Sequence, residues 1–303
     1  MQPLRGITLK LIAVTLFSVM GVLVKAASVE VPPGEAVFFR SFFAIPVTLV
    51  WLVMRHDMRE GLKMHSPVAH LGRGLLGVVT MGLGFSGLAM LPLPEVTAIG
   101  FAAPILVVLL AAVFLGEKIR MFRISAVVLG LIGVLIVLGP SFGESAGEQQ
   151  TLGAIVVLAS ALAAALTQVY MRGLVRTEHT AAIVFYFSMI ASFFALFTIP
   201  FGWVVPSPKV IVMLISAGVL GGVAQLFVTT AFRYADVSVI APFQYAAMLL
   251  ALIFGYFLFE EVPTMTMLAG ATLIMLAGFL IVWRERQLGL ERGQARSKMS
   301  PGG

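Results

Sequence analysis

The residues best suited to bind a solute are polar and aromatic side chains inside long apolar stretches. Amides are costly in a membrane unless they are hydrogen-bonded, so we expect them to face the interior of a helix bundle. Stacking rings beside neutral amides predict a flat, polar, largely uncharged heteroaromatic solute. The alternative is that each amide only bridges neighbouring helices. The substrate-binding candidates are Arg40, Phe101, Pro104, Tyr170, Gln225, Phe243, Gln244 and Tyr245.

Five ionisable residues, Lys25, Glu35, Arg40, Arg73 and Glu95, lie near the ends or interior of these stretches. A charge inside a membrane is a functional candidate by default. Arg40 lies about two turns inside its stretch, where Glu35 on the same helix could help to neutralise it. A functional role for Arg40 and a structural group of ion pairs among Lys25, Glu35, Arg40 and Glu95 are both open. We expect Glu35 and Glu95 at the mouth of a cavity, and Lys25 and Arg73 to extend to an interface.

Several kinds of chemistry have no support in the sequence. Cysteine is absent, and the four histidines show no metal-ligand spacing within a stretch. No phosphate-binding loop occurs, so transport would be driven by a gradient or by exchange. We therefore expect no catalytic residue, metal or cofactor. An intramembrane enzyme, which would need clustered acids or histidines, is the alternative from another class, and a structural scaffold is the next.

Composition predicts an all-α polytopic membrane protein. Hydrophobic residues make up 60% of the 303 residues and charged residues 11%, against roughly 45–50% and 25% in soluble domains. A membrane helix needs about 20 mostly apolar residues, and ten such stretches fit the chain. The predicted spans are 7–28, 35–54, 67–89, 92–115, 122–140, 151–171, 180–200, 209–232, 237–259 and 264–283.

The second five spans echo the first five. Residues 95–99 (EVTAI) align with 236–240 (DVSVI), and the spans that follow carry small residues at similar places, such as Gly133 and Gly270. Because five is odd, two copies must have opposite orientations, as in many secondary transporters. The predicted organisation is a first five-helix repeat at 7–140, a periplasmic linker at 141–150, a second repeat at 151–283, and a basic cytoplasmic tail at 284–303 that we expect to be disordered.

Basic residues orient the predicted bundle. Nearly all Lys and Arg fall in loops on one side if the N-terminus is cytoplasmic, whereas the other side has Lys25 and Lys209. By the positive-inside rule both termini are then cytoplasmic. The expected partners are a small-molecule substrate, the lipid bilayer and, as one option, a second copy of the chain in a homodimer; nucleic acid is not expected.

Two motifs resemble the drug/metabolite transporter superfamily, in its form with two EamA-type domains. Residues 91–119 (LPLPEVTAIGFAAPILVVLLAAVFLGEKI) are similar to its fourth span, in which a proline precedes a Gly-Glu end, as Pro104 precedes Glu117. Residues 241–263 (APFQYAAMLLALIFGYFLFEEVP) resemble a variant of its ninth span. The resemblance implies a bacterial inner-membrane secondary transporter working by alternating access. Riboflavin import is the leading expectation, and S-adenosylmethionine uptake or amino-acid or metabolite export is the runner-up.

Pro104 also predicts a local distortion of the fourth span. Proline has no backbone N–H and leaves the carbonyl of Gly100 without its helical partner. A free carbonyl at membrane depth is tolerated where protein or a wet cavity can satisfy it. We therefore expect the fourth span to bend near Gly100 and to line a cavity, the alternative being a packing kink without a ligand.

Overall fold

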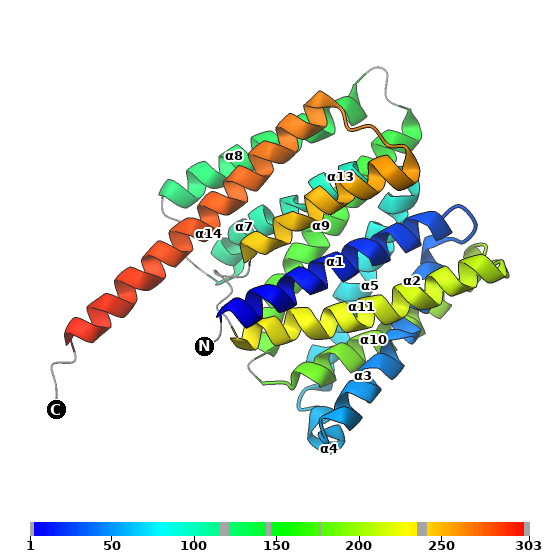
Figure 1. Ribbon diagram of the computed structural model, residues 1–303, viewed down its shortest axis with the longest axis horizontal. Coiled ribbons are helices and arrows are strands. Elements are labelled where there is room, and N and C mark those ends of the chain that lie inside the picture. Colours follow the sequence, from blue (N-terminus) through cyan, green and yellow to red (C-terminus); the bar gives the residue numbers. More distant parts are fainter. Residues whose placement is uncertain (1–2, 116–120, 144–146, 176, 235–240, 300–303) are drawn as a thin grey trace.

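The computed structural model describes residues 3–115, 121–143, 147–175, 177–234 and 241–299, and this part of the chain forms helices and no strand. Figure 1 shows the helices running roughly alongside one another. The long elements are α1 (Pro3–Ala27), α2 (Pro33–Phe42), α3 (Ala44–Met54), α5 (Pro67–Met90), α6 (Leu93–Gly100), α7 (Ala102–Leu115), α8 (Met121–Leu138), α9 (Glu148–Leu174), α10 (Thr180–Leu196), α11 (Pro208–Tyr234), α13 (Ala246–Phe259) and α14 (Met265–Met299). The short ones are α4 (Met58–Gly61), η1 (Gly139–Phe142), η2 (Ile199–Phe201) and η3 (Ala241–Tyr245).

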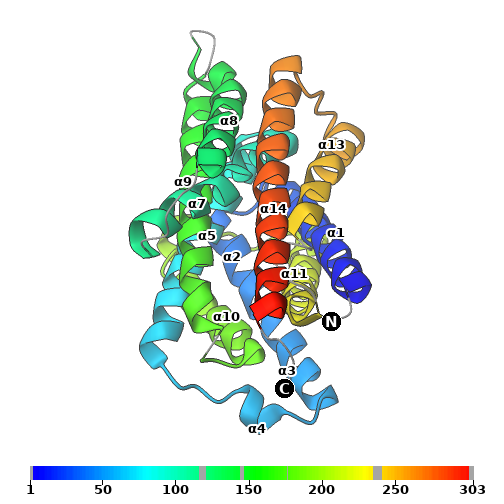
Figure 2. The same ribbon diagram turned by 90° about the vertical axis from the view of Figure 1, so that its left-hand side faces the viewer.

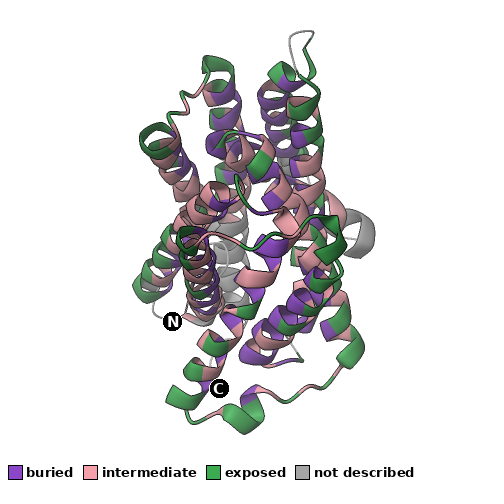
Figure 3. Cartoon of the chain, turned by 90° about the vertical axis from the view of Figure 1, so that its right-hand side faces the viewer, coloured by how far each residue is buried: buried purple, intermediate pink, exposed green. Residues whose placement is uncertain are grey.

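Within these ranges, eight segments are long and apolar enough to cross a membrane. Two shorter apolar helices, Thr180–Leu196 and Phe243–Phe259, coincide with the predicted seventh and ninth spans. Large apolar side chains such as Val53, Leu135 and Phe257 are more than half exposed on the outside of the bundle, as lipid-facing residues must be. Figure 3 shows buried residues on the inward faces and exposed residues at the ends and outer faces. The all-helical prediction is confirmed.

In the described part of the chain, the second and fourth spans are each built from two α-helices. The second span is divided at Phe43, between α2 and α3, and the fourth at Phe101, between α6 and α7. Pro46 and Pro104 each follow the break by three residues. Because a proline ring collides with the carbonyl four residues earlier, it disrupts the helix at this place. The bend expected near Gly100 is therefore observed.

The principal helix pairs all join the first half of the chain to the second. They include α1 with α11, α5 with α9, α8 with α14, α2 with α10, and α6 with α13. The pairing is symmetric between the halves. If each span is replaced by the corresponding span of the other half, the same pairs result. The two views in Figures 1 and 2 agree in placing α8 beside α14.

Glycines permit the closest of these contacts. A β-carbon at Gly133 of α8 would lie 2.8 Å from the carbonyl oxygen of Gly270 in α14. A β-carbon at Gly270 would in turn lie 2.6 Å from the carbonyl oxygen of Gly133. Small residues allow such approach of helix backbones in membranes.

The C-terminal segment extends the last helix. Residues 284–299 continue α14 as a helix, and Figure 1 shows its last turns projecting beyond the other helices. This segment lacks proline and is rich in Arg, Glu, Gln and Leu, which are good helix formers. The Gly-Glu end of the fourth span at Glu117 and the ninth-span echo at 236–240 lie outside the described residues.

Candidate functional site

A cavity of about 440 Å³ lies in the interior of the bundle. It is bounded by α1, α5, α6, α11, η3 and α13, so both halves of the chain form its wall. Most of the lining is apolar and includes the rings of Phe17 and Phe85. Its polar side chains are those of Lys10, Ser18, Thr80, Thr97 and Gln244.

Lys10 is the charged side chain among the residues that line this cavity. It lies about two turns into α1 and is 6% exposed. Its Nζ donates a hydrogen bond of 2.7 Å to Oε1 of Gln244, which joins the first helix to the ninth span. The sequence interpretation missed Lys10 by counting it with the loop charges. The available signal was its position inside the predicted span 7–28.

The structure brings together only some of the predicted binding residues. Gln244 lines the cavity, and the rings of Phe101 and Tyr245 pack together with centroids 5.1 Å apart. Phe101 is buried, so this pair belongs to the packing between the two halves. Tyr170 is 37% exposed and donates from its hydroxyl to the carbonyl oxygen of Ala69 at 3.1 Å, which ties α9 to α5.

Three further candidates lie outside the described lining of the cavity. Pro104 is half-buried in α7, Gln225 is half-buried in α11, and Phe243 is half-buried in η3. The neighbour of Gln225 one turn on, Val228, does line the cavity. These residues shape the helices that surround the cavity, and the structure gives them no polar contact with its interior.

The cavity ends at a polar cluster formed by Lys25 and Glu261. Lys25 Nζ lies 2.9 Å from Glu261 Oε1 and also donates to the carbonyl oxygens of Leu91, at 2.6 Å, and Leu88, at 3.3 Å. Glu261 Oε2 accepts the backbone N–H of Leu93 at 2.8 Å. Since Leu88 and Leu93 line the cavity, the cluster lies against its end. We call this end of the bundle, where α1, α5 and α13 finish, the opposite face. We call the other end, where α1 begins, the terminal face.

Lys25 was expected to extend to an interface or to join an ion pair with Glu35, and among the described residues its acidic partner is Glu261 instead of Glu35. Glu261 follows the end of α13 by two residues. The pair links the end of α1 to the residues after α13, which are distant in sequence. No local pattern indicates such a contact.

The predicted ion pair around Arg40 is not formed by the described residues. Glu35 is buried and accepts the backbone N–H of Val204 at 3.2 Å, while Glu95 accepts a hydrogen bond from the Ser141 hydroxyl at 2.8 Å. Glu95 lines a separate hollow of about 160 Å³ at the opposite face, next to Glu261. The mouth position expected for Glu95 thus corresponds to this hollow, and Arg40 is buried away from both acids.

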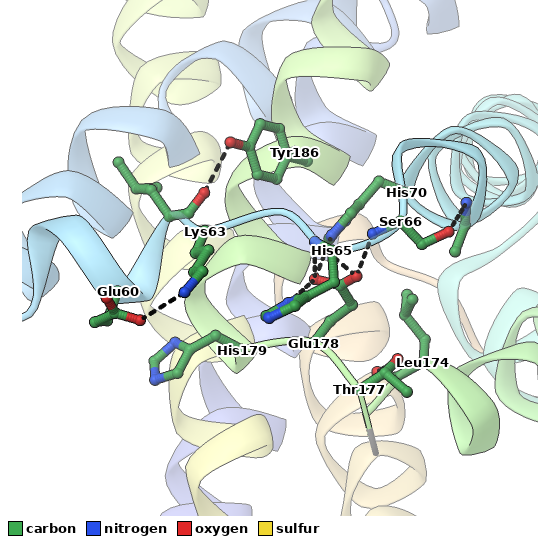
Figure 4. Close-up of polar contacts among 12 residues, drawn as sticks. Glu60, Lys63, His65, Ser66, His70, Leu174, Thr177, Glu178, His179 and Tyr186 are labelled. Carbon is green, nitrogen blue, oxygen red and sulfur yellow. Dashed lines mark hydrogen bonds and ion pairs between the residues drawn. The ribbon is translucent and has the colours of Figure 1, made fainter.

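A second polar cluster lies at the terminal face, around Glu178 (Figure 4). Glu178, between α9 and α10, has a fully buried side chain that accepts the backbone N–H groups of His65 and Ser66. Its Oε2 lies 3.1 Å from His70 Nε2. Burial raises the pKa of Glu178, but the hydrogen bonds from His65, His70 and Ser66 outweigh burial, so the net pKa is lowered. This carboxylate fixes the start of α5 to the loop between α9 and α10.

Comparison with known proteins identifies the family of this fold. The model of the EamA-like transporter family matches residues 4–139 and again 151–283. The chain belongs to the EamA-like transporter family. Its two matches show two EamA-type repeats, as the sequence resemblance implied, and they meet near the predicted linker.

Curated relatives of this EamA-like chain are transporters. The pseudopaline exporter CntI of Pseudomonas aeruginosa is 34% identical over 280 residues, covering 90% of this chain and 94% of the relative. The S-adenosylmethionine uptake transporter of Rickettsia prowazekii is 27% identical over 94% of both chains. The riboflavin transporter of Rhizobium johnstonii is 27% identical over 89% of this chain and 88% of the relative.

A solved crystal structure has the same fold as this EamA-like chain. It superposes with a TM-score of 0.67 over 93% of this chain and 98% of the other, at 20% identity.

Proposed function

We propose that this EamA-like protein is a secondary transporter of a small organic solute, working by alternating access about the cavity that Lys10 and Gln244 line. In this proposal ten membrane helices form two inverted five-helix repeats in a bacterial inner membrane, with both termini cytoplasmic. The family match, the pairing of helices across the halves and the distribution of basic residues support it. The cavity lies within one chain, so transport needs no homodimer.

The proposed substrate carries a carboxylate. The observation that carries this proposal is the ammonium group of Lys10 in a mostly apolar cavity whose described lining has no acidic residue. A buried cation favours an anionic partner, because charge in a low-dielectric site is costly unless it is paired. The amide of Gln244, now bonded to Lys10, would turn to the solute when the carboxylate takes its place. S-adenosylmethionine, the solute named for the Rickettsia relatives, has such a carboxylate.

Riboflavin is the second candidate. The Rhizobium relative named as a riboflavin transporter and the two cavity rings, Phe17 and Phe85, favour it. The rings from which the sequence predicted flavin stacking, Phe101, Tyr170, Phe243 and Tyr245, are not among the residues that line the cavity. A neutral flavin would also leave Lys10 with the amide as its only described partner.

Counterflow in proteoliposomes tests the proposal without assuming a direction of transport. Vesicles preloaded with unlabelled S-adenosylmethionine, riboflavin or single amino acids receive the same labelled solute outside. We expect counterflow of a carboxylate-bearing solute, with a KM roughly tenfold higher or more in Lys10→Met because a charge-assisted contact is lost.

Lys63→Met is the matched control, because Lys63 is exposed between α4 and α5 and pairs with Glu60. It should keep the KM of the unmodified protein. Riboflavin counterflow that is unaffected by Lys10→Met would replace the carboxylate with the flavin. Absence of counterflow for every solute, with the protein folded in the vesicles, would refute the proposed transport of these solutes.

A further inference from the structure

Two buried arginines outside the cavity lining form an unusual cluster. Arg40 of α2 is 4% exposed and Arg73 of α5 is 8% exposed. Their guanidinium carbons lie 5.4 and 4.2 Å from the ring centre of Phe187 in α10. Two positive charges from different helices are therefore held beside one buried ring.

Neither arginine has an acidic partner among the described residues. Nε of Arg40 and Nη1 of Arg73 are buried without a hydrogen-bond partner, and Nε of Arg73 has only the sulfur of Met171, at 3.2 Å. The buried carboxylates of the described chain are those of Glu35 and Glu178. Both are committed to other donors, Glu35 to Val204 and Glu178 to the residues around the start of α5.

Glycines lie against the guanidinium groups. A β-carbon at Gly77 would lie 2.5 Å from Arg73 Nη1, and one at Gly221 would lie 3.2 Å from Arg40 Nε. A larger residue at either position would press on the free N–H groups. Gly77 lies on the same helix as Arg73, and Gly221 of α11 lies against Arg40 of α2, so a glycine adjoins each of the two unpartnered donors.

We propose that Arg40 and Arg73 together form a binding site for a carboxylate. Arginine stays protonated in proteins, so the two charges cannot be relieved by losing protons. Cations buried without a counter-ion are strongly unfavourable. The forked guanidinium donors match the two oxygens of a carboxylate, which would satisfy both free N–H groups and reduce the repulsion between the arginines. The cation–π contacts with Phe187 offer neither a hydrogen-bond acceptor nor a negative charge, so they do not replace a counter-ion.

The carboxylate has two sources with the same chemistry: the transported solute, as it passes between the helices, or a free organic acid that remains bound. The site itself does not depend on the proposed function, because it is tested by binding. Failure to find transport would leave it standing, and failure of the site would leave transport through the Lys10 cavity standing.

The test measures binding of succinate to the full-length protein in detergent. Thermal unfolding is followed with increasing sodium succinate, against sodium chloride at matched ionic strength. We expect a saturable rise in Tm with succinate, and equilibrium dialysis with labelled succinate should give one bound anion per chain. Arg40→Gln and Arg73→Gln should each weaken binding about 30-fold or more, since each removes one partner of a buried charge pair.

Two matched variants separate this site from other cations. Arg55→Gln changes an exposed arginine at the end of α3, and Lys63→Met changes an exposed lysine between α4 and α5; both should keep the succinate effect. Loss of the effect in Lys10→Met with retention in the arginine variants would overturn the proposal and move the anion to the cavity. Where a Gln variant does not fold, Arg→Lys keeps the charge and should still weaken binding, because lysine lacks the fork.

Dialysis of the unmodified protein is decisive by itself, because absence of saturable binding would overturn the site. Counterflow measured with added succinate then distinguishes the two sources of the carboxylate, the transported solute and a free organic acid. Competitive inhibition that Arg40→Gln relieves assigns the site to the transported solute. Tight binding without competition assigns it to a free organic acid.

Discussion

Replacing Lys25 with Met should open the cavity towards the opposite face. Lys25 and Glu261 have side chains 13% and 16% exposed and join α1 to the residues after α13 across the end of the cavity. In an alternating-access cycle this contact exists only while that end is closed, so its loss destabilises one conformation relative to the other. Lys25→Met keeps the apolar stem of the side chain and removes the charge.

The size of the effect follows from the burial and the remaining partners. Exposed ion pairs contribute roughly 0.2–1 kcal/mol, and breaking a fully buried pair costs about 3–5 kcal/mol. This pair is mostly buried, but Glu261 keeps the N–H of Leu93 after the change. We therefore expect about 2 kcal/mol, which shifts the ratio of the two conformations roughly 30-fold.

The absence of cysteine makes the measurement direct. Ser18→Cys places a single thiol in the cavity of a chain that has no other. Its reaction with a membrane-impermeant maleimide, added on the side of the opposite face, reports how often that end is open. The labelling rate should rise by up to about 30-fold in Lys25→Met. Glu261→Gln should give a similar rise, and the double variant little more, because both changes break one contact.

Lys209→Met is the control for this experiment. Lys209 is an exposed lysine at the start of α11, on the same face. Its replacement should leave the labelling rate unchanged. Equal labelling rates in Lys25→Met and the unmodified protein would show that the pair does not close the cavity, and additive effects in the double variant would show that the two residues act separately.

The other predictions concern contacts between helices. Gly133→Ala should lower the free energy of unfolding by about 1–3 kcal/mol in detergent, because its methyl group meets the Gly270 backbone. Gly82→Ala is the control and should leave the free energy of unfolding unchanged, because a β-carbon there has open space. Equal stability of the two variants would contradict the close packing of α8 and α14. Glu178→Gln should lower Tm at pH 7, and the difference from the unmodified protein should shrink as pH falls below the ordinary value of 4.5. The sign follows because a lowered carboxylate pKa stabilises the fold above the unfolded-state pKa; a difference constant with pH would refute it. Tyr170→Phe should cost less than about 1 kcal/mol and leave the counterflow KM unchanged, and a raised KM would return this residue to the binding site.

The sequence predicts the features that depend on local chemistry. Ten apolar stretches of span length and the break ahead of Pro104 follow from hydropathy and from the missing N–H of proline. The echo between the halves predicts two repeats, which the family match shows. Gln244 was chosen because an amide at membrane depth needs a partner, and its partner is Lys10.

The sequence does not predict which side chains from different helices meet. From the sequence, Lys10 resembles the charged residues of the loops, and only the packing of α1 against η3 shows its contact with Gln244. Glu261 likewise lies just past the end of a span, and only the folded bundle shows its contact with Lys25. Aromatic residues are equally suited to packing and to stacking on a solute, so Phe101 and Tyr245 could not be assigned from their type alone. Rotation of each helix about its axis decides these contacts, and that depends on the packing of the whole bundle.

The pairing of helices across the two halves has a consequence for how the protein moves. Because every principal pair combines a helix of the first repeat with a helix of the second, the repeats are interlocked and cannot act as two rigid bodies hinged at residues 141–150. In the proposed alternating-access cycle, the parts that shift against each other would each be assembled from both repeats. The duplicated unit, the five-helix repeat, is thus different from the unit expected to move. Cleavage of the chain between the repeats would leave the two helices of every one of these pairs on different fragments.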